Sequence, residues 1–313
     1  MTGPLDLVFF GTSEFAIPCL RSIIRSRHNL LFAVTRPPRP AGRGKRLTQP
    51  PVSAYLADSH PYIDVHQPEK LDGDFISFLR NRAPHLMVTA AYGAWLPGEL
   101  LSAPPLGVVN VHPSLLPVYR GAAPVTRAIL DGRGETGVSF MLTDEGWDTG
   151  PLIEVFSCGI RDDDTSGTLE ERLARLAGEK VVQVLEDYGA GLLEPVPQSG
   201  KALYADKVST METWMDWNRP ASELERMVRA FQPSPGARTT LRGRLIKILA
   251  AEVAGTAGIP PGELVAGRDG LTVGCGDGSL RVLRLQPSSR RAMTAQEFLR
   301  GFLPEDGARF ESP

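Results

Sequence analysis

Cysteine and histidine are scarce in this chain, and neither is spaced to hold a metal. Three cysteines lie far apart in the 313 residues, and the five histidines form no HxxxH or HExxH pattern. A disulfide framework or a zinc site needs closer and more regular spacing. We therefore expect no metal and interpret the thiols as small buried side chains in reducing surroundings, namely Cys19, Cys158 and Cys275.

Long apolar runs are also missing. No stretch reaches the roughly 18 consecutive apolar residues that a membrane span requires. The opening MTGPLDLVFFG passes within a few residues into a strand-like segment and does not resemble a signal peptide. We expect a protein without a membrane segment that works in the cytoplasm.

The chain has no strong excess of positive or negative charge, since its formal net charge is −2. That balance argues against wholesale wrapping of nucleic acid, yet it leaves room for a local basic patch. One such patch is the segment RPPRPAGRGKR, which has no acidic residue. Its cations, which are candidates for RNA contact or for a merely solvated loop, are Arg36, Arg39, Arg43, Lys45 and Arg46.

The first half of the chain alternates apolar runs with helical segments, as β-α-β units do. Runs that are apolar at consecutive positions are typical of parallel strands covered on both faces. We therefore predict a Rossmann-like, doubly wound, mostly parallel α/β sheet with ligands at the carboxyl ends of its strands. The predicted strands lie at 5–10, 30–34, 85–93 and 107–111.

The second half is mostly β-prone and follows a segment rich in glycine and proline. We predict domains at 1–189 and 207–313, joined by a linker at 190–206. Short β-prone runs separated by Asp-Gly dipeptides indicate hairpins, and a small β-barrel is the expected fold of the second domain. Capping boxes at Thr168 with Glu171 and at Ser222 with Glu225 predict the starts of two amphipathic helices.

In the segment GVVNVHPSLLP, a predicted strand ends in two polar side chains. The period of two places Asn110 and His112 on one face, while Val109 and Val111 point to the other. An amide and an imidazole thus project together at a strand's carboxyl end. Either alone could simply satisfy neighbouring backbone groups, but the pairing favours a chemical role.

Asp148 lies in the turn GWDTGPLI between two β-prone runs. A loop there could return its carboxylate to the sheet edge, beside His112, where it would favour the imidazolium. The alternative is an aspartate that only stabilises its own turn. An aspartic protease is disfavoured because it needs two such carboxylates and the chain has one DTG.

The N-terminal VFFGTSEF is a weak nucleotide signal. It reads as a strand, one glycine and a helix start, but the GxGxxG pattern of dinucleotide folds is absent. Ser13 and Glu14 are as readily explained as helix capping. An oxidoreductase is therefore disfavoured.

The run NVHPSLLPVYRGAAP, followed by DTG, resembles the folate-dependent formyltransferases. FFGTSEFA, RPAGRGKRL, AAYGAWLP, LERMVRAF and LQPSSRRAM extend the resemblance over nearly the whole chain, toward the members that formylate methionyl initiator tRNA. The chain departs from the family pattern at Pro38, Val118 and Ser234.

The resemblance implies a catalytic trio of Asn110, His112 and Asp148. It also implies a turn that holds the formyl donor, 10-formyltetrahydrofolate, formed by Ser114, Leu115, Leu116 and Pro117. The second domain is expected to be an OB-like barrel that binds tRNA, and the basic segment to reach the acceptor end of the initiator methionyl-tRNA. We expect a monomer.

Rival functions stay open at this point. Another 10-formyltetrahydrofolate-dependent enzyme could act on an amino sugar or a glycinamide nucleotide, or hydrolyse the folate. A noncatalytic RNA-binding protein on the same fold is a different class, disfavoured by the intact trio.

Overall fold

The computed structural model describes residues 3–41, 44, 46–255, 258–267, 270–302, 304–305 and 307–312. The chain forms two compact units. The first comprises Met1–Pro124, Glu135–Gly159 and Glu170–Ala205, and the second comprises Val125–Gly134, Ile160–Leu169 and Asp206–Pro313. The second unit thus includes two short stretches that the sequence boundaries assign to the first domain.

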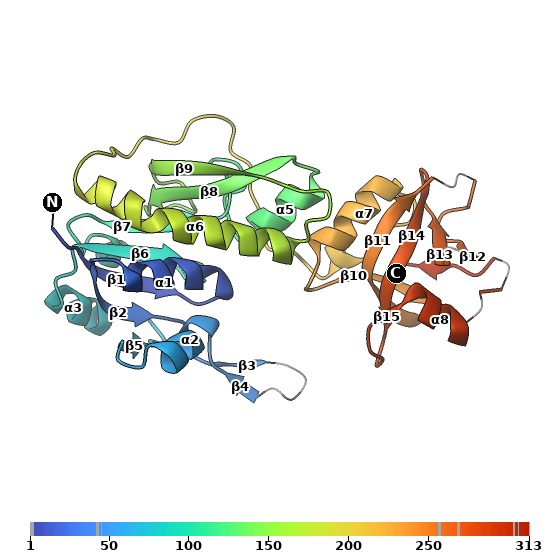
Figure 1. The fold of residues 1–313 in the computed structure, drawn as a ribbon, viewed down its shortest axis with the longest axis horizontal. Helices are drawn as coiled ribbons and strands as arrows, with labels where there is room; N and C mark the ends of the chain where they lie inside the picture. The colour runs from blue at the N-terminus through green and yellow to red at the C-terminus, as the bar shows by residue number, and fades with distance from the viewer. Residues whose placement is uncertain are drawn as a thin grey trace. The chain divides into compact units, whose positions relative to one another are not determined.

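A seven-stranded sheet in the order β5-β2-β1-β6-β7-β8-β9 forms the first unit (Figure 1). Its strands are β1 (Asp6–Gly11), β2 (Asn29–Val34), β5 (Val65–His66), β6 (Leu86–Ala90), β7 (Val108–His112), β8 (Glu135–Leu142) and β9 (Leu152–Gly159). Neighbouring strands from β5 to β7 in this order are parallel, whereas β8 pairs antiparallel with both β7 and β9. The winding reverses between β1 and β6, so the sheet is doubly wound, as predicted.

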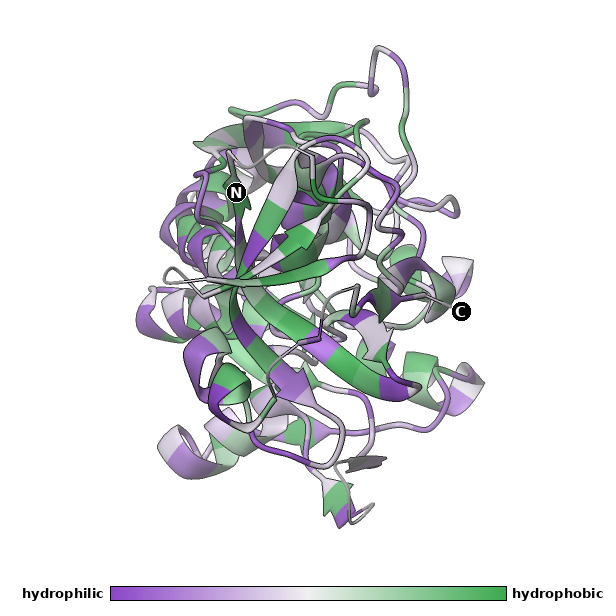
Figure 2. Ribbon diagram, turned by 90° about the vertical axis from the view of Figure 1, so that its right-hand side faces the viewer, coloured by the Kyte–Doolittle hydropathy of each residue, from purple (hydrophilic) through white to green (hydrophobic). Residues whose placement is uncertain are grey.

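Helices pack on this sheet because its strands are apolar on both faces. Every residue of β6, for example, is buried, and in Figure 2 the helix ribbons alternate between green and purple. The helical elements are η1 (Glu14–Ala16), α1 (Ile17–Arg25), α2 (Pro51–Ser59), α3 (Gly73–Asn81), α4 (Gly98–Leu101) and α6 (Ser166–Gly189). A separate hairpin is formed by β3 (Arg39–Ala41) and β4 (Arg46–Thr48).

The second unit is built on an antiparallel sheet in the order β12-β13-β14-β11-β10-β16. Its strands are β10 (Ala237–Leu241), β11 (Arg244–Ala254), β12 (Leu264–Gly267), β13 (Gly270–Gly274), β14 (Ser279–Pro287), β15 (Met293–Thr294) and β16 (Phe310–Glu311). Hydrogen bonds from Leu264 N to Ala308 O and from Phe310 N to Gly262 O join its two ends. The sheet therefore curls into a small barrel, which agrees with the predicted fold class.

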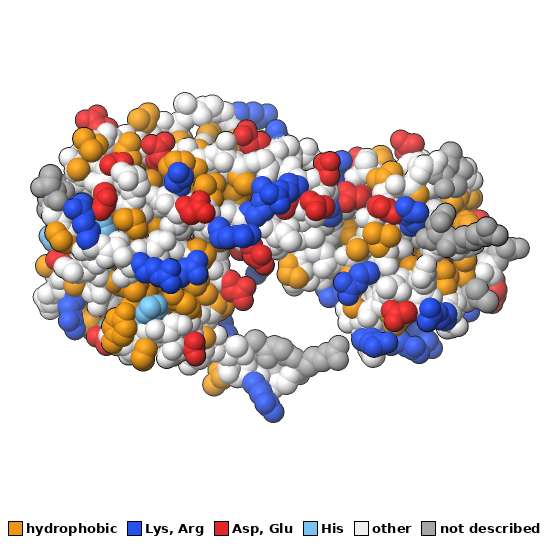
Figure 3. Space-filling model, viewed as in Figure 1, with side chains coloured by type: hydrophobic (Ala, Val, Ile, Leu, Met, Phe, Trp, Pro, Cys, Tyr) orange, Lys and Arg blue, Asp and Glu red, His pale blue; other side chains and the backbone are white. Residues whose placement is uncertain are grey.

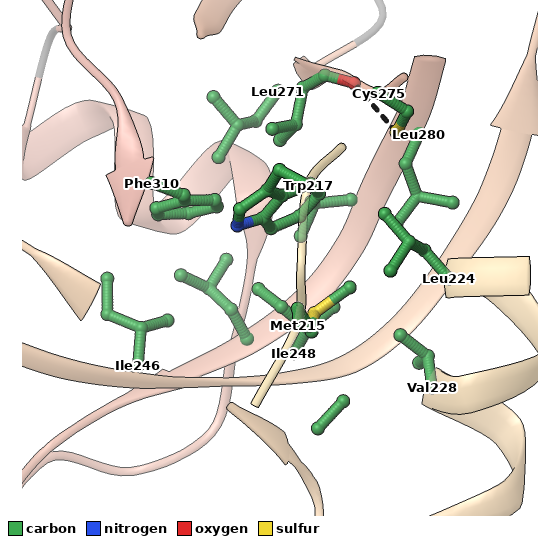
Figure 4. Close-up of a cluster of buried hydrophobic side chains, with 14 of the residues drawn as sticks. Met215, Trp217, Leu224, Val228, Ile246, Ile248, Leu271, Cys275, Leu280 and Phe310 are labelled. Atoms are coloured by element: carbon green, nitrogen blue, oxygen red, sulfur yellow. Dashed lines mark hydrogen bonds between the residues drawn. The ribbon is translucent and has the colours of Figure 1, made fainter. Parts of the chain in front are cut away.

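The barrel encloses a core of apolar side chains (Figure 4). The indole of Trp217 stacks on Phe310, with ring centroids 5.6 Å apart, and donates a hydrogen bond to Thr239 Oγ1. Helix α7 (Ala221–Ala230) is the second predicted amphipathic helix, and its apolar face is buried here, including Leu224 and Val228. The remaining helices of the unit are α5 (Pro124–Leu130), η2 (Met211–Thr213) and α8 (Ala295–Gly301).

Both predicted capping boxes are wrong. Helix α6 begins at Ser166, and Thr165 caps it: its hydroxyl accepts from Thr168 N while Thr168 Oγ1 accepts from Thr165 N. Thr168 is thus the inner partner of the cap, and the helix begins about one turn earlier than predicted. Helix α7 follows Pro220, which has no capping side chain, and Glu225 pairs with Arg229 instead.

The cysteines differ from one another in burial. Cys19 and Cys275 are buried as expected, and burial raises the pKa of their thiols to about 12 and about 11 respectively. Cys158 on β9 is only partly buried, contrary to expectation, and Arg172 Nη2 lies 3.3 Å from its sulfur. Strand β9 is an edge strand, so its outer positions remain partly accessible.

Within the described ranges, no helix combines the length and apolar character needed to cross a membrane. Basic and acidic side chains are interspersed over the face shown in Figure 3.

Candidate active site

Strand β7 places Asn110 and His112 on one face at its carboxyl end. The strand pairs with β6 on one side and β8 on the other, where Asn110 lies opposite Thr89 and His112 opposite Ser139. Val109 and Val111 are buried on the opposite face. The alternation predicted from the sequence therefore brings an amide and an imidazole side by side.

Asp148 lies in the loop between β8 and β9, in a turn that side-chain hydrogen bonds hold in place. Asp144 organises this loop, since its carboxylate accepts from Gly146 N at 3.0 Å and from Thr149 Oγ1 at 2.7 Å. Asp148 itself has φ 53°, in the left-handed region that few residues other than glycine adopt. The turn-stabilising role considered for Asp148 thus belongs to Asp144, and the Asp148 carboxylate is free to face the sheet.

The Asp148 carboxylate meets the amide and the imidazole of β7. Its Oδ1 accepts a hydrogen bond from Asn110 Nδ2 at 3.3 Å, and its Oδ2 lies 3.6 Å from His112 Nδ1. The backbone N–H of Gly121 also donates to Oδ2, at 2.8 Å. The structure therefore brings all three predicted residues together.

The tautomer of His112 follows from its second contact. Nε2 lies 2.9 Å from the carbonyl oxygen of Tyr119, and a carbonyl can only accept, so Nε2 carries a proton. The ring is 5% exposed, which fixes this arrangement. Nδ1 is therefore the ring nitrogen that faces Asp148.

The segment Ser114 to Pro117 forms a turn directly after β7. Ser114 Oγ donates to Val118 O at 2.6 Å, and Ser139 Oγ on β8 both donates to Ser114 O and accepts from Leu116 N. Ser114 and Leu116 are buried, while Leu115 and Pro117 are partly exposed. The hydroxyl of Ser114 is thus already hydrogen-bonded within the turn. Leu115 and Pro117 are the residues of the turn that a ligand can reach.

Several residues that hold the site were missed in the sequence. Gln198, within the predicted linker, donates to the carbonyls of Asp148 and Gly150, and Arg120 donates to its side chain. Gly121, Tyr119 and Ser139 contribute the contacts described above. Tyr119, Arg120 and Gly121 lie within the run that carries the family resemblance, but no local pattern predicts their contacts, which depend on how the chain folds.

The basic segment folds, where it is described, as the β3–β4 hairpin. Arg39 lies on β3 and Arg46 on β4, both exposed to solvent. Arg36 lies just before the hairpin and close to Tyr92; burial raises the pKa of that phenol, and the Arg36 cation opposes the rise. Arg43 and Lys45 lie outside the described residues.

Two family models together cover most of the chain. The model described as formyl transferase matches residues 6–185, and the model for the formyl transferase C-terminal domain matches residues 207–303. The chain belongs to the formyl transferase family. The resemblance inferred from the sequence is confirmed, and the protein is an enzyme of this family.

Relatives of this formyl transferase match it over nearly its full length. A methionyl-tRNA formyltransferase from Myxococcus xanthus is 45% identical over 297 residues, 94% of each chain. One from Aromatoleum aromaticum is 43% identical over 312 residues, 99% of this chain and 98% of the relative.

Solved structures share the fold of this formyl transferase. The methionyl-tRNA formyltransferase from Clostridium thermocellum superposes with a TM-score of 0.58 at 14% identity, covering 80% of this chain and 94% of that one. HypX from Aquifex aeolicus, in complex with tetrahydrofolic acid, gives 0.66 at 16% identity over 96% of this chain and 48% of its own.

Among the residues that the structure describes, no three histidine, cysteine or acidic side chains gather as metal ligands would.

Proposed function

We propose that this enzyme transfers the formyl group of 10-formyltetrahydrofolate to the α-amine of methionyl initiator tRNA. The observation that carries the proposal is the meeting of Asp148 with Asn110 and His112 at the carboxyl end of β7. Full-length relatives at 40–45% identity that are named methionyl-tRNA formyltransferases support this acceptor.

The amine attacks the formyl carbon directly. An α-amine has a pKa of about 7.7 to 8.0, so a useful fraction is neutral at cellular pH. The amide of Asn110 has two N–H donors, of which Asp148 takes one. The other donor stabilises the oxygen of the tetrahedral intermediate as it gains negative charge.

Proton transfer runs through Asp148 and His112. The attacking nitrogen must lose a proton, and the folate nitrogen must gain one before it can leave. Because Nε2 of His112 stays bonded to Tyr119 O, the proton for the leaving nitrogen comes from Nδ1. Asp148 takes up the proton of the amine and returns it to Nδ1, so no covalent enzyme intermediate is required.

The β3–β4 hairpin contacts the acceptor end of the tRNA, and the barrel unit binds RNA beyond it. Arg39 and Arg46 are exposed cations on the two strands of one ribbon. Such charges gain most when a polyanion neutralises them. The turn Ser114 to Pro117 holds the folate, and the enzyme acts as a cytoplasmic monomer.

Comparing acceptors tests the proposal. Purified protein is incubated with 10-formyltetrahydrofolate and methionyl initiator tRNA, methionyl elongator tRNA, an amino-sugar nucleotide or glycinamide ribonucleotide. We expect N-formylmethionyl initiator tRNA and no comparable product with the others. Transfer to the sugar or to the glycinamide nucleotide instead would assign the chain to another branch of the family.

A further inference from the structure

Every hydrogen-bonding group of the Gln198 side chain is used within the site. Its Nε2 donates to the main-chain carbonyls of Asp148 and Gly150, both at 2.8 Å. Its Oε1 accepts from Nε and Nη2 of Arg120, at 3.0 and 2.7 Å. An amide has two donor hydrogens and one acceptor oxygen, so its orientation is fully specified.

These contacts close a ring around Asp148. Gln198 holds the carbonyl of Asp148, and Arg120 holds Gln198. Gly121, the next residue after Arg120, donates its N–H to the Asp148 carboxylate. Asp148 is therefore held at both its main chain and its side chain by one connected set of hydrogen bonds.

The backbone a few residues after Gln198 is held by hydrogen bonds as well. Arg120 N donates to Leu203 O at 2.9 Å, and Ala205 N donates to Arg120 O at 2.7 Å. Gly121 has φ 116°, and a Cβ there would lie 2.9 Å from Ala205 O. The segment 198–205 is thus held against residues 117–123 by main-chain hydrogen bonds.

Asp148 needs such restraint because of its own backbone. A left-handed conformation at a residue with a side chain is unfavourable and persists only where the surroundings impose it. If the Asp148 carbonyl were released, the peptide could rotate toward a commoner conformation. Its carboxylate would then move away from His112 and Asn110.

We propose that Gln198 is a positioning residue that holds the Asp148 carboxylate in place by binding the Asp148 main chain. The proposal rests on the catalytic role proposed for Asp148. Gln198 lies between the two regions matched by the family models, at 6–185 and 207–303. The proposal means that this connecting segment helps to position a catalytic group of the first region.

Two substitutions distinguish this positioning role from one in which Gln198 only binds Arg120. Gln198→Ala removes all four hydrogen bonds, whereas Gln198→Glu keeps an acceptor for Arg120 but has no donor for the two carbonyls. We expect both to lower kcat about tenfold to a hundredfold, the range that follows a displacement of about 1 Å, with KM for either substrate nearly unchanged. Wild-type kcat in Gln198→Glu would overturn the proposal.

A double-mutant cycle tests whether Gln198 acts through Asp148. In an Asp148→Asn background the carboxylate is already lost, so adding Gln198→Ala should reduce kcat no further. Losses that multiply would show an independent, merely structural effect and overturn the proposal. Gln183→Ala, which removes an exposed amide on α6 that binds Asp187, is the matched control and should behave as wild type.

Amide exchange gives a readout that does not depend on the substrate. The Gly121 N–H is protected by the Asp148 carboxylate, so Gln198→Ala should speed its hydrogen exchange about tenfold, while the core of β7 stays protected. Unchanged exchange would overturn the proposal even if formyl transfer itself proved to be the wrong activity. Absence of formyl transfer in the wild type, with faster exchange in the variant, would instead reject only the proposed function.

Discussion

At the scale of single residues, the two aspartates of one loop have separate tasks. Asp144 binds Gly146 N and Thr149 Oγ1 and so shapes the turn, whereas Asp148 faces Asn110 and His112. Both are carboxylates in the same ten residues. The difference comes from direction, because only the left-handed backbone at Asp148 aims its side chain at β7.

Asp148→Asn and His112→Ala should each lower the single-turnover rate of formyl transfer by about two orders of magnitude or more. Asparagine keeps the size of the side chain but can neither take up the amine's proton nor stabilise an imidazolium. Alanine at 112 removes the proton donor to the leaving nitrogen. Rates are measured by rapid quench with enzyme in excess.

Asp58→Asn provides the matched control, since Asp58 is an exposed carboxylate on α2. It should leave the rate unchanged. Near-normal single-turnover rates in the Asp148 and His112 variants would refute their assigned roles.

At the scale of elements, α6 passes very close to α1. A Cβ on Gly178 would lie 2.8 Å from both the carbonyl carbon and the Cβ of Pro18. Glycine within a helix is usually unfavourable by about 0.5–1 kcal/mol relative to alanine. Here its lack of a side chain is what permits the contact between the helices.

Gly178→Ala should therefore destabilise the protein, by about 1–3 kcal/mol as overpacking typically does, against the gain expected from helix propensity. Equilibrium denaturation in urea measures this change. Gly73→Ala is the comparison, because a Cβ at Gly73 on α3 would meet no atom within 4 Å. Equal free energies of unfolding for the two variants would show that α1 and α6 can move apart without loss of stability.

The β3–β4 hairpin carries the prediction about RNA. Replacing Arg39 and Arg46 by alanine should raise KM for methionyl initiator tRNA. The slope of the logarithm of the binding constant against the logarithm of the salt concentration should become shallower by up to about two, one for each lost phosphate contact. Alanine at Arg21 and Arg25, two exposed cations of α1, serves as a control of equal charge. An unchanged slope in the hairpin variant would remove the hairpin from the interface.

At the scale of the whole molecule, a buried histidine ties distant parts of the first unit together. Leu5 N donates to His28 Nδ1 at 3.1 Å, and His28 Nε2 lies 3.7 Å from Glu186 Oε1 on α6. The side chain is 1% exposed. Burial lowers the pKa of His28 below its usual 6.5, although Glu186 opposes the change.

Stability should fall when the solution is acidified below pH 6.5. The folded state holds His28 neutral while the unfolded chain binds the proton, so its contribution is complete above the unfolded pKa of 6.5 and is lost as the pH falls toward the folded pKa. Urea unfolding of wild type and His28→Gln, at pH about 7.5 and about 5.5, measures this. An equal pH dependence in both proteins would contradict it.

Much of the fold was predictable because its signals are local. The apolar runs at 30–34 and 107–111 predicted β2 and β7, and α7 was predicted as an amphipathic helix, which packs its apolar face in the barrel. These patterns repeat every two or 3.6 residues, so a short window contains them. The cap of α6 was misplaced because Thr165 and Thr168 are both candidates, and that of α7 because no side chain caps this helix.

The sequence by itself determined the two-part architecture, the family and the pairing of Asn110 with His112 on one strand. Tertiary structure alone decided how the loop returns the carboxylate of Asp148 to them, and that Gln198 secures it from another segment. The reason is physical. Contacts among residues 110, 148 and 198 depend on how loops return across the sheet, and no interaction between neighbours in the chain encodes that return.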